Sequence, residues 1–97
     1  MKRILVAEDE DAIREFVVIN LQRAGYEVVE ANCGEAALEK YEQENGNFDV
    51  AILDIMMPKL DGLEVLRRLR ERGIKTPVII ISGRNEDYDS LYGLSLG

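Results

Sequence analysis

The chain has 97 residues, of which 46% are hydrophobic and 32% are charged. This composition is typical of one globular domain spanning residues 1–97, and it excludes a second domain or a disordered chain. Nineteen acidic and twelve basic side chains give a formal charge of −7, which disfavours direct binding to nucleic acid or an anionic membrane and favours a cation as the small partner.

Strand and helix patterns alternate in the first half of the chain. An apolar run predicts a strand over residues 3–7, and Asp11 is a suitable N-cap for a helix that ends near Ala24, before Gly25. We expect a second strand over residues 28–31 and a second helix over residues 35–44. The buried face of the first helix is predicted to consist of Ile13, Phe16, Val17, Leu21 and Ala24.

The second half repeats the pattern, starting with a strand over residues 49–53. Asp61 and Glu64 have the spacing of a capping box, with Asp in place of Ser or Thr, and predict a helix that ends at Gly73 and buries Leu63, Leu66 and Leu69. After Pro77, the branched run 78–81 indicates a strand covered on both faces. Residues 86–95 have helical spacing, with Asn85 as a potential cap.

Repeated strand–helix units predict an α/β fold in which helices sandwich a parallel sheet. The carboxyl ends of parallel strands meet at one edge, where open α/β sheets bind ligands. The first strand brings Glu8 and Asp9 to this edge, the third brings Asp54, and the fourth brings Ser82.

Asp54 is the most informative of these residues, because it closes an apolar run and is followed by another. Burying an ionised carboxylate without a partner costs roughly several kcal/mol, so such a group is paired, protonated or bound to a metal. Three neighbouring carboxylates repel one another, and a hard cation such as Mg²⁺ compensates them. Magnesium takes one or two carboxylates, which leaves Asp54 to attack phosphorus and form an aspartyl phosphate while Ser82 donates a hydrogen bond.

The polar residues singled out above also have purely structural explanations. Alone, Asp54 could cap a loop and Ser82 could satisfy the backbone at a strand end, but the convergent acids favour function. Glu10 and Asp11 are expected to be structural, since they precede a helix. A basic cluster on the third helix is expected to be a solvated face interleaved with Glu64 and Glu71. The cluster comprises Arg67, Arg68, Arg70 and Arg72.

Two residue types further limit the chemistry. The chain has no histidine, so it lacks the common zinc ligand and the commonest general base. Its single cysteine, Cys33, allows no internal disulfide, which favours a reducing cytoplasm. No apolar stretch approaches ~18 residues, so we expect neither a signal peptide nor a membrane span.

The order and spacing of these motifs resemble the receiver domain of two-component response regulators. The acidic pair Glu8-Asp9, the candidate phosphoacceptor Asp54, and the Ser82-Gly83 pair match its motifs. The loop between the last two, with Met57-Pro58 and Asp61-Gly62, also matches. The resemblance implies a flavodoxin-like fold and a signalling phosphoacceptor rather than an enzyme acting on an external substrate.

The resemblance also implies roles for individual residues. Asp9 and Asp54 would bind Mg²⁺ with the backbone carbonyl of Met56, and Glu8 would help mainly through water. The phosphoryl group would come from a histidine kinase. Since this chain has no histidine, the phosphohistidine would be on another protein, or a small phosphodonor would be needed. Met56 and Arg84 would tune the lifetime of the aspartyl phosphate. The sequence is most similar to receivers joined to a DNA-binding output domain, which implies control of transcription.

The chain departs from the family pattern after the fourth strand. Receivers have a fifth strand, which ends in a lysine beside the phosphoacceptor, and a fifth helix, whereas this sequence stops at Gly97. We therefore expect a sheet of order 2-1-3-4 with strand four as an edge. Such an edge favours self-association or completion by a partner chain. Without the lysine, we expect phosphoryl transfer to be impaired. Val18 and Ile19 are expected to be part of an uncovered apolar surface. The lysines present are Lys2, Lys40, Lys59 and Lys75, none of which matches the missing one.

Three other functions compete with that of an active receiver domain. A phosphohydrolase of the haloacid dehalogenase type would need an acid two residues after Asp54, where Met56 stands. A flavin-binding domain would need a hydroxyl- and glycine-rich loop after the first strand, where this chain has carboxylates. A receiver-derived module that mediates interactions but no longer switches remains the alternative.

Overall fold

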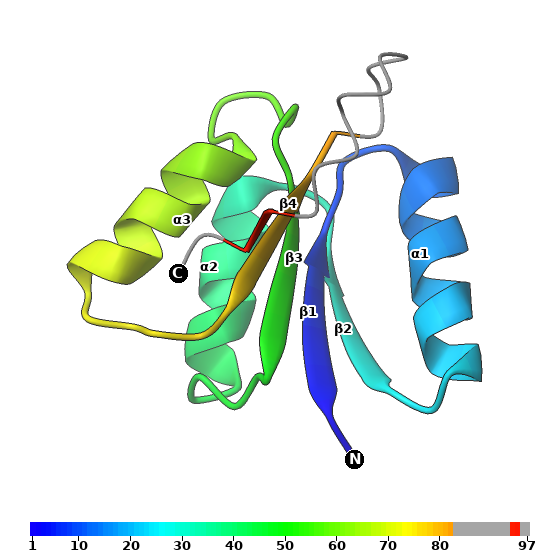
Figure 1. Ribbon diagram of the computed structural model, residues 1–97. Coiled ribbons are helices and arrows are strands. Elements are labelled where there is room, and N and C mark those ends of the chain that lie inside the picture. The colour runs from blue at the N-terminus through cyan, green and yellow to red at the C-terminus, as the bar shows by residue number, and fades with distance from the viewer. Residues whose placement is uncertain (83–93, 96–97) are drawn as a thin grey trace.

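The computed structural model describes residues 1–82 and 94–95 (Figure 1). The described chain alternates strands and helices as the sequence pattern predicts. Its elements are β1 (Arg3–Ala7), α1 (Asp11–Arg23), β2 (Glu27–Ala31), α2 (Gly34–Gln43), β3 (Val50–Asp54), α3 (Gly62–Glu71), β4 (Val78–Ile81) and β5 (Leu94–Ser95).

The strands form one sheet of order β2-β1-β3-β4-β5. The pairs β1–β2, β1–β3 and β3–β4 are parallel, with Ala7 opposite Leu53 and Asp54 opposite Ile81. The predicted α/β fold with a parallel sheet of order 2-1-3-4 is therefore confirmed. Because β3 is hydrogen-bonded on both sides, its last residue, Asp54, lies at the centre of the carboxyl edge.

The other end of the sheet differs from the prediction. Two residues, Leu94 and Ser95, pair with Ile80 and Ile79 in antiparallel orientation. Strand β4 is therefore not a free edge over these residues, because a later part of the same chain supplies their partner. The helix predicted over residues 86–95 is wrong at Leu94 and Ser95, and its other residues lie outside the described part of the chain.

The two faces of the sheet are covered unequally. Helices α2 and α3 lie over one face and α1 over the other (Figure 1). The larger core is on the first face and includes Leu5, Leu53 and Leu69, whereas the smaller core joins Val18 of α1 to Ile4 and Val6 of β1. The prediction that β4 is covered on both faces is wrong: Val78 and Ile80 are buried, but Ile79 and Ile81 are half-buried. Among the described helices, only α1 lies on the side of the smaller core.

The predicted buried faces of two helices are confirmed at Leu66 and Leu69 of α3 and at the half-buried Val17 and Leu21 of α1, but they are wrong at other positions. In α1, Val18 is 6% exposed and Phe16 is 69% exposed. In α3, Val65 is buried and Leu63 is exposed. Residues two apart on a helix point about 200° away from each other, so only one member of each pair can face the sheet. Periodicity allowed either choice, and the contacts with the sheet selected Val18 and Val65. Ala24, also predicted on the buried face of α1, is exposed.

The N-caps of the helices mark where the loops of the carboxyl edge end. Asp61 is the N-cap of α3, as predicted, and its Oδ1 accepts a 2.8 Å hydrogen bond from the Glu64 amide. The N-cap of α1 is Glu10 rather than Asp11, and its side chain makes no capping hydrogen bond. Cys33 is the N-cap of α2, where its Sγ accepts a hydrogen bond from the Ala36 amide. None of the described helices combines the length and the apolar character needed to cross a bilayer.

Candidate functional site

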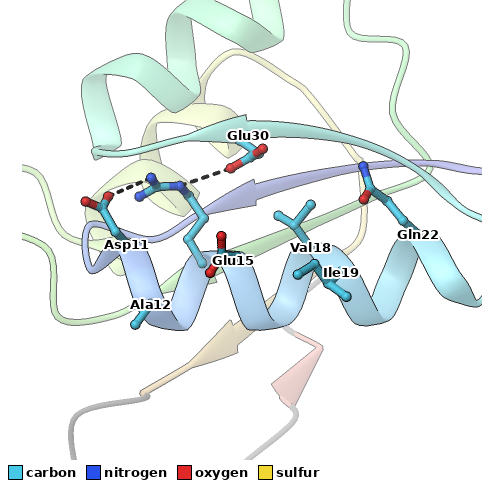
Figure 2. Close-up of a pocket in the computed structure, with 8 residues that line it drawn as sticks. Asp11, Ala12, Glu15, Val18, Ile19, Gln22 and Glu30 are labelled. Carbon is cyan, nitrogen blue, oxygen red and sulfur yellow. Dashed lines mark hydrogen bonds and ion pairs between the residues drawn. The ribbon is translucent and has the colours of Figure 1, made fainter.

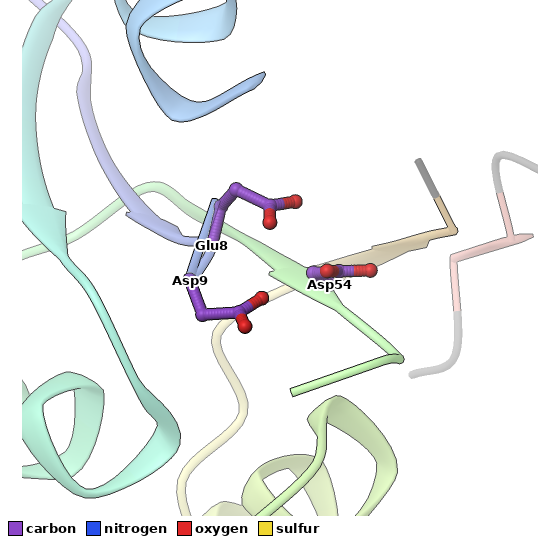
Figure 3. Close-up of side chains that lie close together, drawn as sticks. All are labelled: Glu8, Asp9 and Asp54. Carbon is purple, nitrogen blue, oxygen red and sulfur yellow. The ribbon is translucent and has the colours of Figure 1, made fainter. Parts of the chain in front are cut away.

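Three carboxylates meet at the carboxyl edge of the sheet. Glu8 and Asp9 follow β1, and Asp54 ends β3 (Figure 3). One oxygen from each residue lies within 4.8 Å of the others. The structure thus brings together the three acids that the sequence placed at one edge, although they are 45 positions apart along the chain. These oxygens form a cluster that a cation with oxygen ligands can occupy.

Asp54 is completely buried, with an exposed fraction of 0%. Its Oδ1 accepts a 3.1 Å hydrogen bond from the Met56 amide, which ties the carboxylate to the loop after β3. The backbone beside it is held by the sheet, since the Ile55 amide donates to the Ile81 carbonyl at 2.8 Å. Its Oδ2 receives no hydrogen bond from the described residues. One oxygen therefore orients the side chain and the other is left for a ligand.

Glu8 is also completely buried, and it is held in the same manner. Its Oε2 accepts a 2.9 Å hydrogen bond from the Glu10 amide, while its Oε1 has no donor within the described part of the chain. Burial raises the pKa of Glu8 to about 7, and the carboxylates of Asp54 and Asp9 add to the rise. The Glu10 amide opposes this shift in pKa. Without a cation, Glu8 therefore retains a proton up to near neutral pH.

Arg14 supports the loop that carries Glu8, a role that the sequence analysis did not assign. Its guanidinium donates to the Glu8 carbonyl at 2.8 Å, and it pairs with Asp11 at 2.7 Å and Glu30 at 3.1 Å. The hydrogen bond to Asp11 is the main reason that the pKa of Arg14 is raised. The spacing of Asp11 and Arg14 indicates their pairing in a helix. The contacts with Glu8 and Glu30 depend on the packing of α1 against β1 and β2, which the spacing does not reveal.

The loop after β3 forms one wall of the site. Met57 is buried, whereas the side chain of Met56 is 49% exposed. Lys59 has φ +68°, and the Leu60 amide donates to the Pro58 carbonyl at 2.8 Å, which makes a tight three-residue turn. A hollow of about 360 Å³ lies between this loop and Asp9. Its lining residues are Asp9, Ile55, Met56, Met57, Pro58 and Asp61.

Ser82 follows β4 and is half-buried. Because Ile81 pairs with Asp54, Ser82 lies one residue beyond the strand end that neighbours Asp54. This position is compatible with the predicted hydroxyl of the site. Arg84 and Gly83 lie outside the described residues.

The predicted basic face of α3 is paired with acids rather than gathered into an anion site. Arg67 pairs with Glu64 and Glu71, and Arg68 pairs with Glu64. These two arginines lower the pKa of Glu64 to about 2. Arg70 instead donates to the carbonyls of Ile74 and Thr76.

A second, larger hollow of about 560 Å³ runs along α1, away from the three acids (Figure 2). Arg14 spans it, paired with Asp11 and Glu30, and Val18 and Ile19 form its apolar part. Glu8, Asp9 and Asp54 do not line it. This hollow is larger than the one beside Asp9. The carboxyl edge is nevertheless the better candidate for a reactive site, because it has buried carboxylate oxygens without a hydrogen-bond partner among the described residues.

The donor set at the carboxyl edge fits Mg²⁺. Two buried carboxylates with an oxygen each left unpaired are costly in the absence of a compensating charge. Mg²⁺ takes hard oxygen donors from one or two carboxylates and keeps several waters, and the three acids can supply these carboxylates. The site can therefore hold a divalent cation and present one carboxylate oxygen beside it.

Comparison with known proteins gives a consistent result. Residues 4–97 match the family described as response regulator receiver domain. The chain is 43% identical over 96 residues to the alkaline phosphatase synthesis transcriptional regulatory protein PhoP of Bacillus subtilis, covering 99% of this chain and 39% of that protein. It is 43% identical over 95 residues to the transcriptional regulatory protein DltR of Streptococcus agalactiae, covering 98% and 42%. The chain thus spans about two fifths of the length of these relatives.

Solved structures agree with the sequence comparison. A response regulator receiver domain protein from Clostridium thermocellum superposes with a TM-score of 0.80 at 32% identity, over 84% of this chain and 65% of that one. The response regulator protein TrrA of Thermotoga maritima, solved in complex with Mg²⁺-BeF, gives a TM-score of 0.71 at 48% identity, over 84% of this chain and 68% of that one.

Proposed function

The chain belongs to the family of response regulator receiver domains, and from that membership we propose that Asp54 is its phosphoacceptor. The observation that carries this proposal is a fully buried aspartate, within a cluster of three acids, whose Oδ2 has no hydrogen-bond partner among the described residues. A strand-end aspartate that only capped its loop would need Oδ1 alone, which the Met56 amide already satisfies. The second oxygen and the two neighbouring acids favour a reactive role.

The donor in this proposal is a phosphohistidine on a histidine kinase. An oxygen of Asp54 attacks phosphorus and forms a P–O bond, while the P–N bond breaks and its electron pair returns to the imidazole nitrogen. That nitrogen then takes a proton from solvent. Because residues 1–97 contain no histidine, the donor residue lies outside them.

Glu8, Asp9, Asp54 and the Met56 backbone carbonyl are the proposed ligands of Mg²⁺. When bound, the ion offsets negative charge on the transferring phosphoryl oxygens. The fit of the donor set and the Mg²⁺-containing structure of the related TrrA protein support this assignment. Ser82 is proposed to donate a hydrogen bond to a phosphoryl oxygen, on the basis of its position one residue beyond the partner of Asp54.

In the whole protein, we propose that phosphorylation controls a DNA-binding output and that the protein is cytoplasmic. The transcriptional regulators among its relatives support the first part, and they do not favour the non-switching module considered above. Self-association through β4 would compete with the pairing of Ile79 and Ile80 to β5.

The four lysines do not match the lysine of the family pattern, so we propose slow phosphoryl transfer in residues 1–97 alone.

Phosphorylation with acetyl phosphate tests the proposal. We expect intact mass spectrometry to show one added phosphoryl group that requires Mg²⁺ and is lost in Asp54→Asn. Asp49→Asn is the matched control, because Asp49 is an exposed aspartate just before β3, at the opposite end of that strand. Labelling that persists in Asp54→Asn, or that EDTA does not reduce, would contradict the assignment.

A further inference from the structure

Gly62, the first residue of α3, lies directly against the backbone of Asp54. A Cβ built on Gly62 would be 2.4 Å from the Asp54 carbonyl oxygen, 2.9 Å from its carbonyl carbon and 3.2 Å from the Ile55 Cα. All three neighbours are main-chain atoms of a central strand or its first loop residue. A side chain at position 62 therefore cannot be accommodated by a rotamer change.

A second glycine makes the same kind of contact at the other end of the loop. A Cβ on Gly34, the first residue of α2, would be 2.3 Å from the Leu60 carbonyl oxygen and 2.9 Å from the Leu60 Cβ. It would also be 2.9 Å from Cγ2 of Val65, in the first turns of α3. Both glycines are buried.

The loop between these contacts carries the proposed ligands. Asp54 and Ile55 lie at its start, Met56 follows, and Leu60 lies near its end. We infer that Gly34 and Gly62 are positioning residues. Because they have no side chain, the starts of α2 and α3 pack closely against this loop, and this packing fixes Asp54 and the Met56 backbone for cation binding. The inference rests on the proposed function, and it adds two residues that touch neither the cation nor the phosphoryl group.

The sheet determines which part would move if a methyl group were added. The backbone of β3 is paired on both sides, and the Ile55 amide is bonded to the Ile81 carbonyl. The start of α3 and the loop before it lack such cross-strand pairing, and Lys59 already holds that loop in a tight turn. A methyl group on Gly62 would therefore push the loop outward. The 3.1 Å hydrogen bond from the Met56 amide to Asp54 Oδ1 would be lengthened or lost.

The test compares Gly62→Ala and Gly34→Ala with Gly73→Ala. Gly73 follows the other end of α3, has φ +79°, and has nothing within 4 Å of a built Cβ. Alanine there is strained and destabilising but does not press on the loop, so it controls for loss of stability. Isothermal titration calorimetry of each folded variant gives the Mg²⁺ dissociation constant. Amide chemical shifts in the metal-free protein report on Met56 directly.

We expect the Mg²⁺ dissociation constant to rise at least tenfold in Gly62→Ala, to rise less in Gly34→Ala, and to stay within twofold in Gly73→Ala. The Met56 amide should shift in the first two variants only. Unchanged Mg²⁺ affinity in Gly62→Ala would overturn the inference, as would an equal loss in Gly73→Ala. If both Gly62→Ala and Gly34→Ala fail to fold while Gly73→Ala folds, the glycines serve the fold alone and the inference is also overturned. If the wild-type chain binds no Mg²⁺, the proposed function itself fails, which is a distinguishable result.

Discussion

Glu8 and Asp54 are both fully buried in one cluster, and each has a carboxylate oxygen that receives no hydrogen bond from the described residues. The two side chains come from adjacent strands whose carboxyl ends meet by parallel pairing. Folding therefore places two buried acidic groups close together, and this arrangement lowers stability until a proton or a cation enters.

The stability of the metal-free protein should fall as pH rises from about 4.5 to about 7. The pKa of Glu8 is raised from 4.5 to about 7 on folding, so in this window the native state holds a proton that the unfolded state has released. Each pH unit in the window then lowers the free energy of unfolding by at most about 1.4 kcal/mol. Urea denaturation in EDTA at several pH values measures this dependence.

Glu8→Gln is the matched variant for this prediction, because it keeps the shape and removes the titrating proton. Its free energy of unfolding should depend less on pH between 4.5 and 7 than that of the wild type. No histidine contributes in this range. A wild-type stability that rises across the window would show that Glu8 is not the protonated group.

Asp54→Asn should stabilise the metal-free protein by about 1–2 kcal/mol, since an amide removes one of the clustered like charges and adds N–H donors. The order should reverse with Mg²⁺ at saturating concentration, because only the wild type retains the full set of carboxylates and gains the binding energy. Thermal or urea unfolding with EDTA and with Mg²⁺ measures both effects. A variant less stable than the wild type in EDTA would argue against charge repulsion at the site.

Lys59→Gly should raise the free energy of unfolding by about 0.5–1 kcal/mol, because Lys59 has φ +68°, a conformation that costs a residue with a side chain more than it costs glycine. Lys75→Gly is the control, since Lys75 is an exposed loop lysine without a positive φ. It should lose stability through the greater entropy of the unfolded chain. Equal effects of the two substitutions in urea denaturation would exclude backbone strain at position 59.

Cys33→Ser should stabilise α2 by about 0.5–1 kcal/mol. Cys33 is the N-cap, and its Sγ accepts from the Ala36 amide at 3.3 Å, a bond that a serine hydroxyl makes better. Cys33→Ala removes the acceptor and should have the opposite sign. Chemical denaturation of the wild type, Cys33→Ser and Cys33→Ala measures the free energy of unfolding of each. A serine variant no more stable than the alanine variant would show that the thiol contributes through packing rather than as a cap.

The sequence by itself was sufficient for the order of the elements as far as β4 and for the parallel part of the sheet. Alternating apolar runs and helical patterns leave few arrangements other than a βαβ fold, and parallel pairing then sends every strand's carboxyl end to one edge. The convergence of Glu8, Asp9 and Asp54 follows from that topology, which is why it could be predicted from strand ends alone.

The tertiary structure decided the exact rotation of α1 and α3 against the sheet, what pairs with β4, and how the loop after β3 is held. Val18 rather than Phe16, and Val65 rather than Leu63, are buried because helix rotation depends on the shape of the opposing sheet, which periodicity does not contain. Arg14 beneath Glu8 and Gly62 against Asp54 were not foreseen for the same reason. Both are contacts between segments distant in sequence, and such contacts exist only once the layers have packed.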